Sequence, residues 1–287
     1  MNKRGKIVQE NKKQKRVRNI LIIALIVILC AFTVILDFVE IEYISDELQN
    51  AIFSKLIQQT CGGIAAVLLM IQLKIRLFGK PKNLLFLIPC LIIAVDNFQF
   101  SAYFNGKMEL LHNEALDFIL FAGYCLAVGI FEECVFRGVI FSLLAGVFPK
   151  NKKGFLLTYV LSSVVFGLAH IMNGISWQIG YTILTGGLFA FCLIKTKNVF
   201  CAAFVHGLYN FCGLLFEYYN PELKTIGLGS GVVFDTGTVV TMIIVSVLVG
   251  VFILYKVITY SESERIDLYE KLGIKLKKEE RVEGESD

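Results

Sequence analysis

Two adjacent carboxylates, Glu132 and Glu133, lie in the middle of an apolar run from Phe118 to Phe148, with Arg137 close behind them. Ionisable groups at mid-membrane cost about 2.5 to 3.5 kcal/mol, and they usually pair, face a cavity and serve function. On a helix, Glu133 and Arg137 share a face and can form an ion pair. Glu132 points about 100° away, so it can meet a different partner and act as a general base for water.

Two histidines follow in later apolar runs of the chain. His170 ends the run Phe166-Gly-Leu-Ala-His170, and Asn210 follows His206 by four residues, so these last two side chains converge on one helix face. An imidazole and an amide offer donors that can hold a developing oxyanion. The structural alternatives are an interfacial role for His170 and an interhelical hydrogen-bond clasp for His206 and Asn210. Under these structural alternatives, the only role of Glu132, Glu133 and Arg137 would be to hold helices together. His112, beside Asn113 and Glu114, is expected at the surface.

The same groups are also candidate metal ligands. Two imidazoles and a carboxylate, here His170, His206 and Glu132, form the ligand set of many catalytic zinc sites. The helical zinc-protease pattern with two histidines four residues apart around a glutamate is absent. Sequence spacing therefore assigns no cofactor and leaves a divalent metal such as zinc as an alternative.

The composition indicates an integral membrane protein, because 56% of the residues are hydrophobic and only 18% are charged. A helix needs roughly 17 to 25 apolar residues to cross the hydrocarbon. The sequence predicts an all-α, polytopic bundle of about eight transmembrane helices around a central intramembrane cavity. The predicted spans are Ile20–Leu36, Leu56–Leu73, Leu84–Val95, Phe118–Phe148, Phe155–His170, Ile179–Ile194, Val199–Phe216 and Val239–Val257.

Loop charges predict the orientation and the domain limits. Cytoplasmic loops carry an excess of Lys and Arg, and basic and non-basic loops alternate along this chain. This pattern places both termini in the cytoplasm of a multi-pass cell-membrane protein. We expect a basic tail over 1–19, a transmembrane domain over 20–260 with a polar core at 115–215, and a charged tail over 261–287. The basic tail suits anionic lipid headgroups, and nucleic-acid binding is not favoured.

The polar motifs, taken in order, resemble those of a known family. Glu132-Glu133-Cys134-Val135-Phe136-Arg137, Phe166-Gly-Leu-Ala-His170 and His206-Gly-Leu-Tyr-Asn210 are similar to the three motifs of the CPBP family of CAAX proteases and bacteriocin-processing enzymes, also called Abi. The resemblance covers about Ala115 to Leu215. Asn210 stands where the family has Asn or Asp.

The resemblance implies an intramembrane endopeptidase of the glutamate type that acts on a membrane-associated protein or peptide. Glu132 would activate the attacking water with help from His170, His206 and Asn210 would stabilise the oxyanion, and Glu133 and Arg137 would support the site. Bacteriocin maturation or self-immunity is a role linked to bacterial members. The alternatives are a scaffold or immunity protein that keeps the motifs for structure, and a transporter, which inverted repeats would favour.

Depth in the membrane conflicts with this arrangement. With the predicted spans, straight perpendicular helices would not bring Glu132, His170 and His206 to one level. The run Phe118–Phe148 would also extend over more than about 40 Å as a continuous helix. We therefore expect either helices that tilt or break around a cavity or span boundaries that differ by several residues. Within the run Phe118–Phe148 we expect a break or an interfacial portion.

Overall fold

The protein is an all-helical bundle in the computed structural model, which describes residues 17, 19–33, 35, 39, 41–44, 47–98, 100–106, 115–170, 177–218, 236–274 and 276. The described residues contain no β-strand, so the predicted fold class is confirmed. The basic segment 1–16, His112 and the end of the charged tail from residue 277 onward lie outside the described residues.

Each predicted span falls on a helix. In the part of the chain that the structure describes, four helices are long and apolar enough to cross a membrane, namely Gln49–Gln72, Phe118–Val147, Lys152–Ala169 and Val239–Ile258, and four shorter apolar helices accompany them. The membrane bundle is therefore supported, while the count of eight spans stays a prediction. The shorter helix nearest the N-terminus covers Asn19–Thr33. The other elements are α2 (Glu47–Gln72), η1 (Leu84–Phe86), α3 (Leu87–Asp96), α4 (Phe100–Phe104), α5 (Ala115–Glu133), η2 (Cys134–Ile140), α6 (Phe141–Val147), α7 (Lys152–Ala169), α8 (Trp177–Thr196), α9 (Val199–Tyr218), α10 (Thr236–Ile258) and α11 (Glu262–Lys271).

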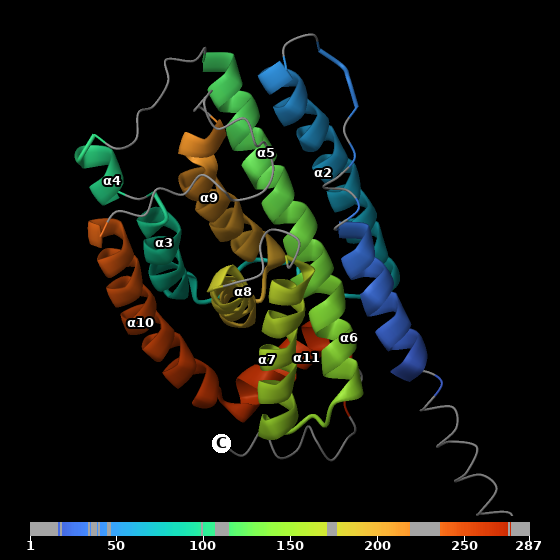
Figure 1. The fold of residues 1–287 in the computed structure, drawn as a ribbon. Helices are drawn as coiled ribbons and strands as arrows, with labels where there is room; N and C mark the ends of the chain where they lie inside the picture. Colours follow the sequence, from blue (N-terminus) through green and yellow to red (C-terminus); the bar gives the residue numbers. More distant parts are fainter. Residues whose placement is uncertain are drawn as a thin grey trace, which may run out of the picture.

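The longest helical segment forms the axis of the bundle. In Figure 1, α5 and α6 follow each other along one line, α2 and α9 flank α5, and α8 is viewed nearly end-on, so it crosses the direction of its neighbours. The closest packing of the bundle joins α5 to α9 and to α2, and α7 to α8. The elements that carry the three polar motifs, namely α5 with η2, α7 and α9, therefore pack together with α8 in one bundle.

The long segment Phe118–Val147 is continuous, so the expected break is not found, and its middle is a π-helical stretch. η2 begins at Cys134, directly after the two glutamates, and all seven of its residues are buried, including Arg137. π-Helical turns inside α-helices are rare and occur frequently at functional sites. The extra residue per turn changes which side chains face the neighbouring helices at this level.

Two glycines let α5 and α9 cross at very short range. A Cβ atom added to Gly129 would lie 2.4 Å from the carbonyl oxygen of Ala203, and one added to Gly207 would lie 3.0 Å from the Cα atom of Leu126. Only residues without a side chain fit such a contact between backbones. Because His206 precedes Gly207 and Glu133 lies one turn after Gly129, this crossing brings the two motifs together.

The turn before α7 fixes where that helix begins. The Asn151 side chain accepts a hydrogen bond of 2.9 Å from the backbone N–H of Gly154, which caps the helix. A Cβ at Gly154 would lie 1.9 Å from the carbonyl oxygen of Pro149, so the turn needs glycine there. α7 ends at Ala169, and His170 is its C-terminal cap.

The charged segment after α10 forms α11, which packs against the bundle. Leu268 and Tyr269 are buried. The carboxylate of Asp267 accepts hydrogen bonds from Lys82, at 2.9 Å, and from Lys197 in the loop between α8 and α9. α11 thus joins two loops that are far apart in the sequence.

Candidate active site

Glu133 lies at the centre of a fully buried polar triad. Its Oε2 atom is 3.1 Å from Nε of Arg137, and the side chains of both residues are 0% exposed. Its Oε1 atom is 2.9 Å from Nδ1 of His206. The ion pair expected from the spacing of Glu133 and Arg137 is present, whereas the contact with His206 joins α5 to α9 and could not be seen in the sequence.

Glu132 has a different set of partners. Its Oε2 atom lies 3.3 Å from Nε2 of His170 and 4.0 Å from Nε2 of His206. The side chains of Glu132 and His170 are 13% and 23% exposed, in contrast to the fully buried Glu133. Two imidazole nitrogens therefore converge on one oxygen of the more accessible glutamate.

The hydrogen-bond partners define which ring nitrogens carry protons. Nδ1 of His170 lies 2.8 Å from the carbonyl oxygen of Phe166, which only accepts, so this nitrogen donates. Nε2 of His170 is then the atom presented to Glu132. Glu133 is paired with Arg137 and acts as an acceptor, so Nδ1 of His206 donates to it. Nε2 of His206 consequently carries a lone pair when the ring is neutral and a second N–H when the ring is an imidazolium.

Arg137 connects the triad to α8 and to two aromatic rings. Its Nη2 atom donates a 2.8 Å hydrogen bond to the carbonyl oxygen of Gly186. Its Cζ atom lies 4.2 Å from the ring centroid of Phe166 and 5.5 Å from that of Phe189. A guanidinium is suited to this environment because it pairs with a carboxylate and stacks on aromatic faces.

The structure brings five of the six predicted site residues together. Glu132, Glu133, Arg137, His170 and His206 form one connected set, although they come from α5, η2, the end of α7 and α9. His170 joins this set from its position as the C-terminal cap of α7. Asn210 lies one turn beyond His206 on α9, half-buried, and its side chain makes no hydrogen bond to any described residue.

The expected alternative of a metal at Glu132, His170 and His206 is not assigned by the structure. Among the residues that the structure describes, no three His, Cys, Asp or Glu side chains are arranged to hold a metal ion. Both rings present Nε2 to Glu132, since Nδ1 of His206 bonds Glu133 and Nδ1 of His170 bonds the carbonyl oxygen of Phe166. The metal stays a prediction, and the chemistry below is derived from the side chains alone.

Sequence reasoning missed one aromatic residue of the site. Phe189, on α8, stacks on the His206 ring with a centroid distance of 4.4 Å and an interplanar angle of 16°. The chain contains 24 Phe residues, and no spacing or neighbouring polar residue sets this one apart. Only the tertiary packing of α8 against α9 identifies it.

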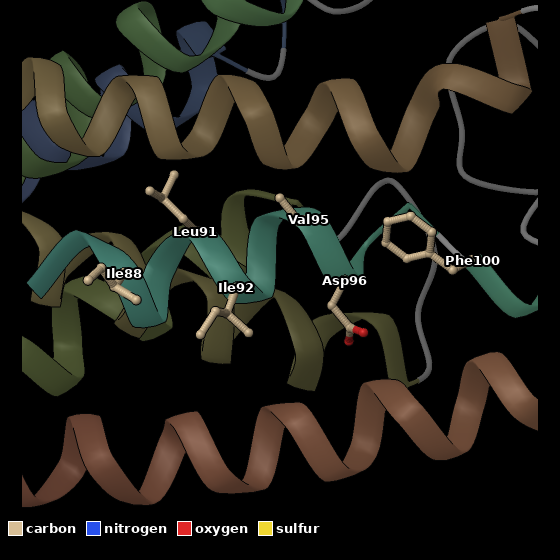
Figure 2. A pocket seen from close by; sticks show the side chains of 6 residues that line it. All are labelled: Ile88, Leu91, Ile92, Val95, Asp96 and Phe100. Carbon is tan, nitrogen blue, oxygen red and sulfur yellow. The ribbon is translucent and has the colours of Figure 1, made fainter.

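A groove beside α3 lies apart from these residues. It has a volume of about 430 Å³ and is lined by Ile88, Leu91, Ile92, Val95, Asp96 and Phe100. Figure 2 shows these side chains along α3 and at the start of α4. None of the six predicted site residues lines the groove, so it is not the predicted central cavity, which stays a prediction.

Comparison with known proteins was made for the whole chain. Residues 114–212 match a family model described as type II CAAX prenyl endopeptidase Rce1-like. The matched segment contains all six predicted site residues and ends inside α9. No curated protein and no solved structure matches the chain.

Proposed function

We propose that the protein, whose residues 114–212 match the Rce1-like family model of type II CAAX prenyl endopeptidases, hydrolyses a peptide bond within the membrane by means of a water activated by Glu132. One observation carries the assignment of this role. Glu132 is the glutamate on which His170 and His206 converge, at 3.3 Å and 4.0 Å, while Glu133 is fully engaged by Arg137 and His206.

The first step is attack by water on the scissile carbonyl. A water beside Glu132 and His170 gives its proton to the Glu132 carboxylate as its oxygen forms a bond to the carbonyl carbon. His170 is oriented for this task because its other nitrogen bonds the carbonyl oxygen of Phe166. Breakdown of the tetrahedral intermediate breaks the C–N bond, and the proton on Glu132 moves to the leaving amine.

The second requirement is stabilisation of the oxyanion. His206 supplies a donor from Nε2 when its ring is an imidazolium, and its Nδ1 is held by the Glu133 carboxylate at 2.9 Å. Nε2 of His206 lies 4.0 Å from Glu132. An oxyanion bound to this nitrogen would therefore lie beside the water that Glu132 activates. Asn210, one turn further on α9, would add an amide donor once substrate is bound.

The substrate class follows from the family description. A type II CAAX prenyl endopeptidase acts on a lipidated protein C-terminus, so a membrane-associated peptide is the proposed substrate. The apolar helices around the site suit a substrate that approaches from the bilayer.

Kinetics of a carboxylate-to-amide variant test the proposal. We expect Glu132→Gln to lower kcat for a farnesylated CAAX peptide by about 10² to 10⁴-fold in proteoliposomes. Asp96→Asn is the matched control, because it makes the same change in an apolar helix at a residue that lines the α3 groove instead. Full activity of Glu132→Gln would refute the role of Glu132 and favour a scaffold. Failure of the wild-type protein to cleave the peptide would count against a prenylated substrate.

A further inference from the structure

α8 forms a wall of the site although it carries none of the three motifs. Phe189 is 1% exposed and lies almost parallel to the His206 ring, with a centroid distance of 4.4 Å. Phe166 and Tyr209 contact the Phe189 ring edge-on, each with a centroid distance of 6.0 Å. One turn earlier on α8, the carbonyl oxygen of Gly186 accepts a hydrogen bond from the site.

The His206 ring needs such a contact because both of its nitrogens must be oriented at the same time. Nδ1 must face Glu133 while Nε2 faces Glu132. The torsion that sets the plane of a histidine ring is broad, and one hydrogen bond at Nδ1 leaves the ring free to tilt about that bond. A flat ring packed parallel at 4.4 Å removes this freedom.

We propose that Phe189 is a positioning residue that holds the plane of His206, so that Nε2 points at the reacting centre. The inference rests on the proposed function for its catalytic consequence, since His206 is the oxyanion donor there. The contact itself is independent of that function. Phe189 touches no reacting atom and acts only through His206.

The same helix offers a matched control. Phe191 is 0% exposed, and its ring contacts those of Phe86 and Phe252, with centroid distances of 5.9 Å and 6.4 Å. Phe191→Leu therefore removes the same atoms from the same helix without a contact to the site. Phe189→Met fills space without a ring, and Phe189→Tyr keeps the ring.

Steady-state kinetics provide the first readout. Phe189→Leu and Phe189→Met should lower kcat by up to about 10²-fold, because a small misplacement of a catalytic group is enough for such a loss. KM should not change, since the interaction is made in the transition state. Phe189→Tyr and Phe191→Leu should keep the wild-type kcat. Equal losses in Phe189→Leu and Phe191→Leu would overturn the inference.

Nuclear magnetic resonance of ¹⁵N-labelled histidine gives a readout that needs no activity. The chain has only three histidines, so each ring can be assigned with single His→Gln variants. Phe189→Leu should shift and broaden the His206 ring signals and leave those of His170 unchanged. Unchanged His206 signals would overturn the inference even in an active peptidase. Altered signals in a protein without peptidase activity would support the inference and refute the proposed function.

Discussion

Glu132 and Glu133 are neighbours in the sequence but lie in different environments. Glu133 is fully buried between Arg137 and His206, whereas Glu132 keeps partial exposure and faces two imidazole nitrogens. The first arrangement suits a structural anion, and the second suits a group that exchanges protons with water. Helix periodicity predicted the pairing of Glu133 with Arg137. It could not predict the contact of Glu133 with His206, because that contact depends on how α9 packs.

Removal of the Arg137 charge should therefore affect stability more than removal of the Glu132 charge. Arg137→Ala leaves Glu133 buried without its main counter-ion, and such a loss costs about 3 to 5 kcal/mol. Unfolding of the detergent-solubilised protein, followed by circular dichroism, measures the difference. Glu132→Gln should unfold close to the wild type.

A double variant tests whether the loss of stability in Arg137→Ala comes from the unpaired buried charge of Glu133. Arg137→Met combined with Glu133→Gln removes both buried charges, so it should recover most of the stability that Arg137→Ala loses. Wild-type stability of Arg137→Ala alone would contradict the buried ion pair.

At the scale of the elements, apolar runs located the helices. The π-helical stretch η2 within the continuous helix Phe118–Val147 and the crossing direction of α8 were not predictable, because both depend on side chains from several helices. Pairs of small residues such as Gly62-Gly63 and Gly186-Gly187 permit close helix packing. In the structure these glycines pack inside the bundle, Gly62 against Phe131 and Gly186 against Phe166. Gly129 and Gly207 were not singled out, since an isolated glycine has no directional signal.

Gly129→Ala tests the crossing of α5 and α9. The new methyl group would lie 2.4 Å from the carbonyl oxygen of Ala203, so the helices must separate. Overpacking of this kind costs about 1 to 3 kcal/mol, and the shift should move His206 away from Glu133 and lower kcat. Gly146→Ala on the same long segment is the control, because no described heavy atom lies within 4 Å of its added Cβ. Equal behaviour of the two variants in unfolding and cleavage assays would argue against a close crossing.

At the scale of the whole molecule, α11 holds together loops from distant parts of the chain. The backbone N–H of Arg76 donates to the carbonyl oxygen of Lys271 at 2.7 Å, and Asp267 accepts from Lys82 and Lys197. The sequence indicated a charged surface helix, and composition alone could not show that it would dock. The alternation of loop charges predicts both termini in the cytoplasm, and this orientation stays a prediction.

Acidification should loosen α11 from the bundle. Burial acts to raise the pKa of Asp267, but hydrogen bonds and charge from Lys197 and Lys82 outweigh it and hold the pKa below its usual value. A lowered pKa in the folded state stabilises docking above the ordinary pKa of about 4, and this contribution is lost as the pH falls through the folded value. The protection of α11 amides from hydrogen exchange, corrected for the pH dependence of the intrinsic rate, should therefore fall at low pH, and Asp267→Asn should show the lower protection already at neutral pH. Protection that does not depend on pH would contradict this role.

The central claim is that Glu132 activates a water and does not itself attack the substrate. A single turnover of a farnesylated CAAX peptide in H₂¹⁸O, followed by mass spectrometry of peptide and protein, tests it most directly. If Glu132 activates water, ¹⁸O appears in the new peptide carboxyl group and not in Glu132, and Glu132→Gln forms product about 10² to 10⁴-fold more slowly. Label in the Glu132 carboxylate, or undiminished cleavage by Glu132→Gln, would contradict it.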